Sequence, residues 1–529
     1  MTHARTARTV LALLVTVGCL LGVPTSQAVS DPAPTVGAEV AEALRLAVPS
    51  YAHVDATGGA NGCLTTSAGP DPVVYRDDRI VLRSNLTNPQ ITTRVNDTLR
   101  AMSVPAVVGP IERIAVPTRP VAVASAPADR SVGPALAVPD AVVEPSGLPI
   151  VVVTITNRGS EPLPIVRLAR RLRLLVPPIV TSPDYLLSPT PPVGMWPDGF
   201  AAATTVEEKP RGATLGAGVD IWVYDSGLPP TKDGNWAPNV SRLTPADVEH
   251  LDVLDPNGNI VDIYSGGHTL AIADVIYTVA PAAKVRAARI TDDSGVATDV
   301  SAARRMAATL SGTADWPEVI VNAFGSPTCN RGGAFPNEDL EPLGLQAVTQ
   351  AVGRQDDVLL VASAGNRASD RRFYPAAFDT AASPLDDAVL GVGALDTTLA
   401  ANGTPWSSAT RTAPVADFSN SGTWVEAWAP GAHLTSRHVN NLRFQVADAT
   451  ILGRATISGT SFSAPYVAGL LADVVSRSPA TNRLTSPQAW AALRASGRPC
   501  PAGGGGTALA LTSMSGTSTT RANGTPNEC

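Results

Sequence analysis

The sequence has few charged residues, few cysteines, no surplus of basic side chains and only one long apolar run. Of its 529 residues 16% are charged, and the net charge is −7 with a pI near 5.5. Because an acidic chain lacks the positive surface that attracts phosphates, nucleic acid is not expected as a partner. With 44% hydrophobic residues the chain can still bury a large core, and its length predicts two domains with extensions.

The one long apolar run lies near the N-terminus. Arg5 and Arg8 precede apolar residues 10–23, and the small-residue sequence Ser26-Gln-Ala28 follows. This order is typical of a secretory signal peptide, here residues 1–28. A transmembrane anchor is the alternative, but the run is short and is interrupted by glycines. No second long apolar segment follows, so we expect a secreted, extracellular chain without a stable membrane anchor.

Cysteine is scarce. Beyond the expected signal peptide there remain Cys63, Cys329, Cys500 and Cys529. In an exported chain four cysteines can form two disulfides, and the sequence does not choose among the three connectivities. For the Gly/Ser/Thr-rich tail, residues 499–529, the simplest arrangement is a loop closed by its two cysteines.

An alternation of strands and helices is expected over residues 71–185. β-Branched runs predict strands, and apolar residues at helical spacing predict helices that begin at Asn88 and at Leu163. The strands are expected at residues 73–83, 111–116, 150–155 and 179–185. The order β-α-β-β-α-β predicts a small ferredoxin-like α+β domain. The second helix carries several arginines, for which a solvated face is the simplest interpretation.

Two irregular segments border this domain. Residues 29–70 form an expected N-terminal extension of small and polar residues, and residues 186–213 form a linker rich in Pro, Gly and Thr. An exposed linker of this composition is easily cut by proteases.

Apolar strands and helices alternate from residue 214 to residue 498, which is typical of an α/β domain. Asp225 directly follows the strand expected at 219–224, and His268 follows two glycines at the start of a helix. Ligands of open α/β sheets bind at the carboxyl ends of the strands, so Asp225 stands where a site is expected. A turn aspartate and a capping or packed histidine are the alternatives.

A turn that carries Ser461 leads into a further helix. Pro465 is expected in its first turn, so the helix should begin within a few residues of Ser461. A hydroxyl at a helix start lies among unpaired N–H groups at the positive end of the helix dipole, where developing negative charge is stabilised. Gly459, lacking a side chain, should leave open space for a substrate backbone. An N-cap role for the serine is the alternative.

Two further strand ends complete the expected site. One strand ends in small residues near position 325, as an exposed edge that pairs with a peptide would. The other ends at Asn366, whose uncharged amide is the kind of donor that an oxyanion requires. The residues expected to bind an extended peptide are Ala323, Phe324, Gly325, Ser363, Ala364 and Gly365.

The chemistry unites these residues. A serine hydroxyl becomes a nucleophile when a histidine accepts its proton, and a carboxylate fixes the histidine tautomer and stabilises its charged form. The Asn366 side chain and the Ser461 backbone N–H would hold the oxyanion. The order Asp225, His268, Ser461 along the chain is one of the three known for this triad.

Motifs in this same order resemble those of the subtilisin-type serine peptidases, the subtilase family. They are Asp225-Ser-Gly, Gly267-His268, Ala364-Gly-Asn366 and Gly459-Thr-Ser461-Phe-Ser-Ala-Pro. The resemblance covers about residues 214–498. It implies a subtilisin-like three-layer α/β domain with a mostly parallel central sheet, preceded by the small α+β ferredoxin-like domain as a propeptide, which would assist folding and block the cleft until it is cut.

The resemblance also implies an activity. The chain would be a secreted serine endopeptidase, made as a zymogen, that hydrolyses protein or peptide substrates through an acyl-enzyme intermediate and acts as a monomer. Its own propeptide would be a further partner. No cofactor is implied. Structural calcium occurs in the family, but no dense run of Asp and Glu assigns a metal site here.

The chain departs from the family pattern around the histidine and at the substrate strand. Thr269 replaces a glycine after the histidine, and Asp274 replaces a helix glycine, so its carboxylate must be solvated or hydrogen-bonded. The usual Ser-Leu-Gly-Gly at the substrate strand is Ala-Phe-Gly-Ser326. Two alternatives follow: a catalytically inactive binding protein of peptidase fold, and a peptide ligase.

Overall fold

The computed structural model describes most of the chain from residue 73 to residue 509. The described residues are 73–119, 148–160, 163–175, 177–187, 212–231, 235–249, 260–261, 266–291, 296–313, 315–328, 340–378, 388–396, 413–444, 449–500 and 507–509. The expected signal peptide, the N-terminal extension, most of the linker and most of the tail lie outside them. Within the described part, no helix combines the length and apolarity needed to cross a membrane.

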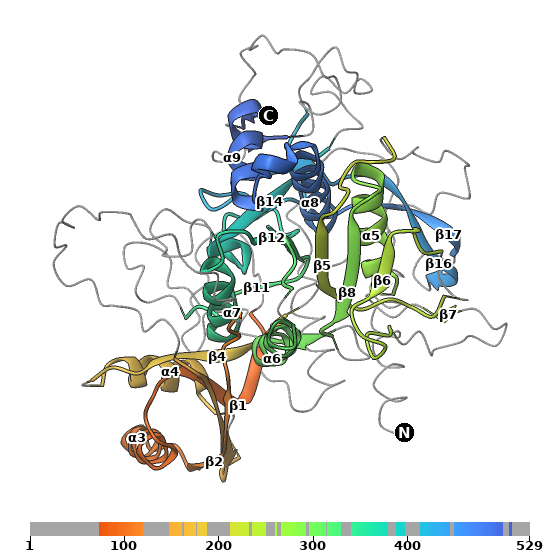
Figure 1. Ribbon diagram of the computed structural model, residues 1–529. Helices are drawn as coiled ribbons and strands as arrows, with labels where there is room; N and C mark the ends of the chain where they lie inside the picture. The colour runs from red at the N-terminus through yellow and green to blue at the C-terminus, as the bar shows by residue number, and fades with distance from the viewer. Residues whose placement is uncertain are drawn as a thin grey trace, which may run out of the picture.

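The N-terminal domain, residues 73–187, has the predicted order of elements. They are β1 (Tyr75–Arg83), α3 (Asn88–Ala101), β2 (Ala106–Ile114), β3 (Ile150–Asn157), α4 (Ile165–Arg173) and β4 (Val180–Leu187). The strands pair in the order β2-β3-β1-β4, all antiparallel. The two helices lie on one face of this sheet, in the lower part of Figure 1. This is the ferredoxin-like arrangement that the sequence predicts.

Alternating residues divide the two faces of this sheet between two cores. Ile80 and Val153 pack with α3 and α4, whereas Val81 and Val152 point away from these helices. In α3 the buried residues Ile91, Val95 and Leu99 recur every fourth position, as the sequence predicts. The second apolar face of the sheet therefore needs a partner outside the N-terminal domain.

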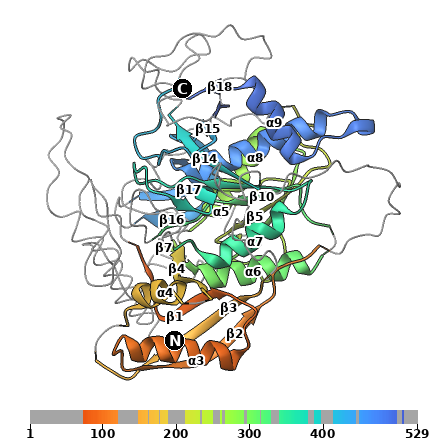
Figure 2. The same ribbon diagram turned by 90° about the vertical axis from the view of Figure 1, so that its left-hand side faces the viewer.

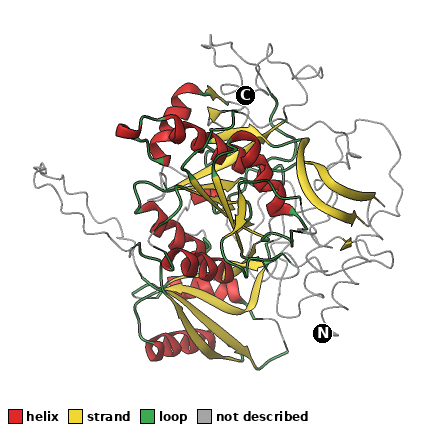
Figure 3. Ribbon diagram, turned by 45° about the vertical axis from the view of Figure 1, so that its right-hand side comes forward, coloured by secondary structure: helices red, strands yellow, loops and turns green. Residues whose placement is uncertain are grey.

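The α/β domain, residues 212–509, is built on a nine-stranded sheet. The strand order is β18-β19-β15-β14-β12-β10-β5-β8-β6, and the central pairs are parallel. The strands are β5 (Asp220–Asp225), β6 (Val240–Arg242), β8 (Lys284–Arg289), β10 (Val319–Asn322), β12 (Leu359–Ser363), β14 (Val389–Leu395), β15 (Ala427–Pro430), β18 (Arg498–Pro499) and β19 (Thr507–Ala508). Figures 2 and 3 show helices on both sides of it.

Three layers result, as predicted. The helices are α5 (His268–Val279), α6 (Asp299–Ser311), α7 (Leu343–Gly353), α8 (Thr460–Arg477) and α9 (Ser486–Ser496). Val223 and Val321 pack with α5, α8 and α9 on one face of the sheet. Tyr224 and Ile320, the neighbouring residues, pack with α6 and α7 on the other. Strands buried on both faces explain why the sequence reads as continuous apolar runs.

Smaller strands complete the α/β domain. β16 (Leu434–Phe444) and β17 (Ala449–Ile457) form an antiparallel hairpin joined by β7 (Ile260–Val261). β11 (Ser326–Pro327) pairs with β13 (Phe373–Tyr374), and β9 (Ala297–Thr298) precedes α6. The expected domain end at residue 498 is too early, because β19 pairs with β15 and Leu509 is fully buried. Cys500 is disulfide-bonded, and the remaining cysteines lie outside the described residues.

The second face of the N-terminal sheet rests on α6 and α7. Figure 1 shows these two helices between the N-terminal domain and the central sheet. Val81 and Val152 share one apolar core with Val300, Ala303 and other residues of these helices. β4 also pairs with β9, so the small sheet continues across the boundary between the two domains. The two domains are therefore joined by apolar packing and by backbone hydrogen bonds.

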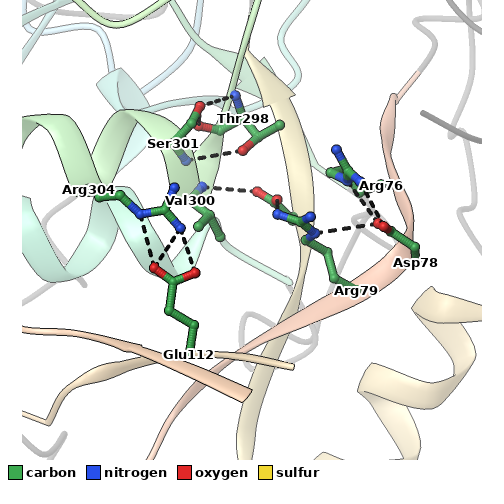
Figure 4. Close-up of polar contacts among 9 residues, drawn as sticks. Arg76, Asp78, Arg79, Glu112, Thr298, Val300, Ser301 and Arg304 are labelled. Carbon is green, nitrogen blue, oxygen red and sulfur yellow. Dashed lines mark hydrogen bonds and ion pairs between the residues drawn. The ribbon is translucent and has the colours of Figure 1, made fainter. Parts of the chain in front are cut away.

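Polar contacts surround this apolar interface (Figure 4). The Val300 N–H at the start of α6 donates to Asp184 Oδ1 over 2.9 Å, and Arg79 lies 3.6 Å from the other carboxylate oxygen. Arg304 on α6 forms a two-pronged ion pair with Glu112 of β2, at 2.7 and 2.8 Å. Asp184 is fully buried, whereas the Glu112 pair is half-exposed, so their contributions to stability should differ.

Candidate active site

Asp225 and His268 form a fully buried pair. Asp225 is the last residue of β5, and His268 is the first residue of α5. The imidazole Nδ1 lies 2.8 Å from Asp225 Oδ1, and neither side chain is exposed to solvent. A carboxylate at Nδ1 favours the tautomer that carries its proton there, which leaves a lone pair on Nε2. The sequence therefore predicts this contact correctly.

Glycines shape the turns on both sides of the pair. Gly227 and Gly267 have φ of +88° and +77°, in the left-handed region that glycine adopts freely. A Cβ at Gly267 would also stand 2.7 Å from the His438 ring, so a larger residue there would displace that ring or the start of α5. The turn at Gly267 therefore sets the direction in which the chain enters α5, and the turn at Gly227 sets the direction in which it leaves Asp225.

The same oxygen of Asp225 accepts two further hydrogen bonds. The Ser226 backbone N–H donates to Oδ1 over 2.7 Å, and the Thr269 hydroxyl donates to it over 3.0 Å. Thr269, the residue that departs from the family pattern, therefore contacts the aspartate directly. Such donors stabilise the ionised carboxylate.

Ser461 is the second residue of α8 and is 1% exposed. Its hydroxyl donates to the Ala323 carbonyl over 3.2 Å. The next residue, Phe462, packs its ring against His268 with ring centroids 5.4 Å apart. The start of α8 thus lies against the start of α5, and Ser461 directly precedes the residue that contacts His268.

The expected place of Pro465 is wrong. It is the sixth residue of α8 and lies inside the helix, not in its first turn. Because proline lacks an N–H and crowds the carbonyl four residues earlier, the ordinary helical bond to the Ser461 carbonyl is not made. The helix still begins immediately before Ser461, as predicted.

Asn366 is fixed by the same helix start. Its side-chain Oδ1 accepts from the Thr460 backbone N–H and from the Thr460 hydroxyl, both over 2.8 Å. With the oxygen so occupied, the Nδ2 group faces Gly459, where a Cβ would stand 3.2 Å away. The space beside Gly459 is therefore bordered by the amide of Asn366, not open as expected.

The residues expected to pair with a peptide are present but are arranged differently. Ala323 and Phe324 are buried, so the expected exposed edge is wrong for this segment. A Cβ at Gly325 would lie 2.4 Å from the Phe373 ring and from the Tyr374 carbonyl. Two strands account for this closure: β13 pairs with β11, which continues the segment, and β4 of the N-terminal domain lies against β11.

The second segment expected to bind a peptide, residues 363–365, makes backbone hydrogen bonds to other parts of the chain. The Ala364 carbonyl accepts from the Asn420 side chain over 2.9 Å, and the Gly365 carbonyl accepts from the Asn420 backbone N–H. The Gly365 N–H donates to the Thr460 hydroxyl. The backbones of Ala364 and Gly365 are thus hydrogen-bonded within the chain, and peptide binding at residues 363–365 stays a prediction.

Other residues of the site were not predicted from the sequence. Glu249 is buried beside the pair and accepts from the Gly267 N–H over 3.0 Å; burial raises the pKa of its carboxyl to about 8. His438 lies on β16, and burial together with the nearby His268 lowers its pKa to about 3. The Asn420 side chain donates to the Ala364 carbonyl, two residues before Asn366. No local motif marks these three, because the fold alone brings them to the site.

Asp274 has the hydrogen-bonded environment that the sequence requires. Its carboxylate accepts from the Arg437 backbone N–H over 2.7 Å and lies 3.0 Å from the Arg437 guanidinium. The altered helix is thus compatible with the fold. In the described part of the chain, His, Cys, Asp and Glu residues form no group suited to holding a metal ion.

Fold and site together define a three-layer α/β protein with an aspartate–histidine pair and a serine at a helix start. Residues 258–499 match the family model described as the subtilase family. The chain therefore contains a subtilase-family domain.

Two curated relatives share parts of this chain. The thermophilic serine proteinase of Bacillus sp. (strain AK1) is 34% identical over 119 residues, which are 22% of this chain and 21% of that protein. The cuticle-degrading serine protease of Arthrobotrys oligospora is 25% identical over 281 residues, 53% of this chain and 57% of that protein. The chain thus spans a fifth to three fifths of the length of these relatives.

Solved structures give similar matches. A cold-adapted subtilisin-like serine proteinase aligns over 57% of this chain and 91% of its own, with a TM-score of 0.38 and 21% identity. A lanthipeptide protease aligns over 53% of this chain and 80% of its own, with a TM-score of 0.37 and 20% identity.

Proposed function

We propose that this chain is a secreted serine endopeptidase, made as a zymogen, in which Asp225, His268 and Ser461 are the catalytic residues. The observation that carries the proposal is the Asp225–His268 hydrogen bond at the start of α5, against which Phe462, the neighbour of Ser461, packs at the start of α8. The names of the two relatives, a serine proteinase and a serine protease, support the same chemistry.

The reaction would begin with proton transfer. His268 keeps its Nδ1 proton toward Asp225 and takes the Ser461 hydroxyl proton at Nε2, as the serine oxygen attacks the peptide carbonyl carbon. The histidine then protonates the leaving amine, and an acyl-enzyme remains. Water then attacks the acyl carbonyl carbon while His268 Nε2 takes one of its protons, and the histidine returns a proton to the Ser461 oxygen as the acid is released.

The oxyanion would be held by two preorganised donors. They are the Asn366 Nδ2 group, which faces Gly459, and the Ser461 backbone N–H at the start of α8. The bonds from Thr460 to Asn366 Oδ1 keep the amide from turning its oxygen toward the substrate. A donor fixed before the reaction needs no rearrangement when charge develops, and this is the source of its catalytic effect.

The N-terminal domain would act as the inhibitor that keeps the zymogen inactive. It covers α6 and α7, and its last strand, β4, pairs with β9 and lies against β11 beside the expected substrate segment. The three proposed catalytic residues are at most 1% exposed in this state. Cleavage within residues 186–213 would separate the domain from the peptidase and leave it held by non-covalent contacts alone.

Processing of the secreted chain tests this function. Intact mass and N-terminal sequence are compared for the wild type, for Ser461→Ala and for Ser463→Ala, a matched control two residues along the same helix. We expect wild type and control to be cut within residues 186–213 and to hydrolyse casein, and Ser461→Ala to do neither. Equal processing of all three without hydrolysis would favour an inactive binding protein. Transfer to an added amine in place of hydrolysis would favour a ligase.

A further inference from the structure

The backbone on both sides of Asn366 is bonded to one buried side chain, that of Asn420. This residue is 1% exposed and lies in the segment between β14 and β15. Its Nδ2 group donates to the Ala364 carbonyl over 2.9 Å. Its Oδ1 accepts from the Arg367 N–H over 2.9 Å and from the Ser369 N–H over 3.2 Å. The chain from residue 364 to residue 369 therefore closes around this single amide.

The two segments that meet here are also joined through their backbones. The Asn420 N–H donates to the Gly365 carbonyl over 2.9 Å, and the Ala368 N–H donates to the Phe418 carbonyl over 2.8 Å. Gly365 has a φ of +97°, and a Cβ there would stand 2.6 Å from Asn420 Nδ2. Only a residue without a side chain fits at this close approach. Residues 364–369 are thus held directly against residues 418–420.

The chemistry of these contacts requires an amide at position 420. The group must donate to a carbonyl with one end and accept from two N–H groups with the other, which a carboxylate or a hydroxyl of this reach cannot do. Thr460 separately fixes the side-chain oxygen of Asn366. The orientation of the Asn366 amide is therefore set from α8, whereas the place of its backbone is set from Asn420.

We propose that Asn420 is a positioning residue that fixes the backbone around Asn366, so that the Asn366 amide stands where the oxyanion forms. The proposal rests on the proposed function. A donor contributes to catalysis in proportion to how well its position is fixed before the reaction. Displacement of a catalytic group by about 1 Å can cost about 100-fold in rate.

A double-mutant cycle tests this proposal on the full chain after processing. Asn420→Ala should lower kcat about 10- to 100-fold with little change in KM, since the oxyanion donor is displaced. In the Asn366→Leu background the same change should lower kcat by no more than about twofold, because the donor that it positions is already gone. A smaller amount of folded enzyme would instead reduce turnover equally in both backgrounds.

Two further variants complete the cycle. Asn420→Asp keeps both N–H partners and loses the donor to Ala364, so it replaces Asn420→Ala in the cycle where that variant does not fold. The matched control is Ser419→Ala, which removes a buried bond from the Ala394 N–H in the same segment. The control should keep the kcat of the wild type.

A second measurement does not depend on turnover. In full-length Ser461→Ala, hydrogen-exchange protection of the Arg367 and Ser369 amides should fall about tenfold with Asn420→Ala, which removes their shared acceptor, and should be kept with Ser419→Ala. Unchanged protection, or an equal loss of kcat in both backgrounds, would overturn the proposal. Failure of the proposed peptidase function would appear differently, as absent wild-type turnover with the loss of protection intact.

Discussion

Asp184 of the N-terminal domain caps the start of α6 in the α/β domain: its Oδ1 accepts the Val300 N–H over 2.9 Å, in a fully buried position. Burial raises the pKa of Asp184 to about 6, although the Val300 bond and Arg79 both act to lower it. Burial, followed by the charge of Asp184, raises the pKa of Asp299 to about 7. The contact between the two domains therefore contains a titratable group, Asp184, and burial there disfavours its charged form.

Docking of the N-terminal domain should weaken as the pH rises through about 6. In the separated domain Asp184 would titrate near its ordinary value of about 4, so the docked form binds a proton more tightly. The stabilisation is complete below pH 4 and is lost as Asp184 ionises in place. Protection of the Val300 amide in hydrogen exchange, corrected for intrinsic rates in full-length Ser461→Ala, should be about tenfold higher at pH 5 than at pH 8.

Asp184→Asn should remove most of this pH dependence, because an amide accepts from Val300 without titrating. The matched control is Glu112→Gln, which breaks the half-exposed pair with Arg304 and should cost less than about 1 kcal/mol. The control should keep the wild-type pH dependence. Protection that rises between pH 5 and pH 8 would contradict this prediction.

Asp225→Asn should lower kcat by about 10⁴-fold, because the amide favours the histidine tautomer that cannot act as base. Its shape matches that of aspartate, so the fold should be kept. Steady-state hydrolysis together with a thermal unfolding scan checks this. Loss of less than tenfold in kcat would show that the 2.8 Å contact with His268 has no part in turnover.

Asn366→Leu should lower kcat about 100- to 1,000-fold with little change in KM, since an oxyanion donor is lost. It should also destabilise the domain by about 1–3 kcal/mol, because the buried Thr460 N–H loses its acceptor.

Asn366→Asp separates the two effects of that residue. The carboxylate still accepts from Thr460, so unfolding should resemble that of the wild type, while kcat falls at least as far as in Asn366→Leu. Equal turnover of Asn366→Asp and wild type would show that the amide does not contact the oxyanion.

Local patterns predicted the elements well. The order of the N-terminal domain and the α/β class of the second domain follow from apolar periodicity, which each segment carries by itself, whereas the three layers were expected from the resemblance to the subtilase family. Strand β2 begins earlier than predicted, at Ala106, because Gly109-Pro110 reads as a break. The pairing of β2 with β3 shifts between Val108 and Ile111, and such an irregular edge strand tolerates proline.

Contacts made by residues without a local motif were the part that the sequence did not reveal. Asp225, His268, Asn366 and Ser461 each carry a short motif, and the fold brings their elements together. Glu249 and Asn420 have no such motif and reach the site only because loops fold back on it. The contacts of residues 364 and 365 were missed for the same reason: Asn420, more than 50 residues away, hydrogen-bonds both of their carbonyls.

The central claim is that Ser461 is an activated nucleophile, and a fluorophosphonate probe tests it most directly. The secreted chain is labelled after processing, and the modified residue is located by peptide mass spectrometry. We predict one adduct, on Ser461, that is retained in Ser463→Ala and lost in His268→Ala. A folded wild-type chain that takes no label, or that is labelled on another serine, would contradict the account.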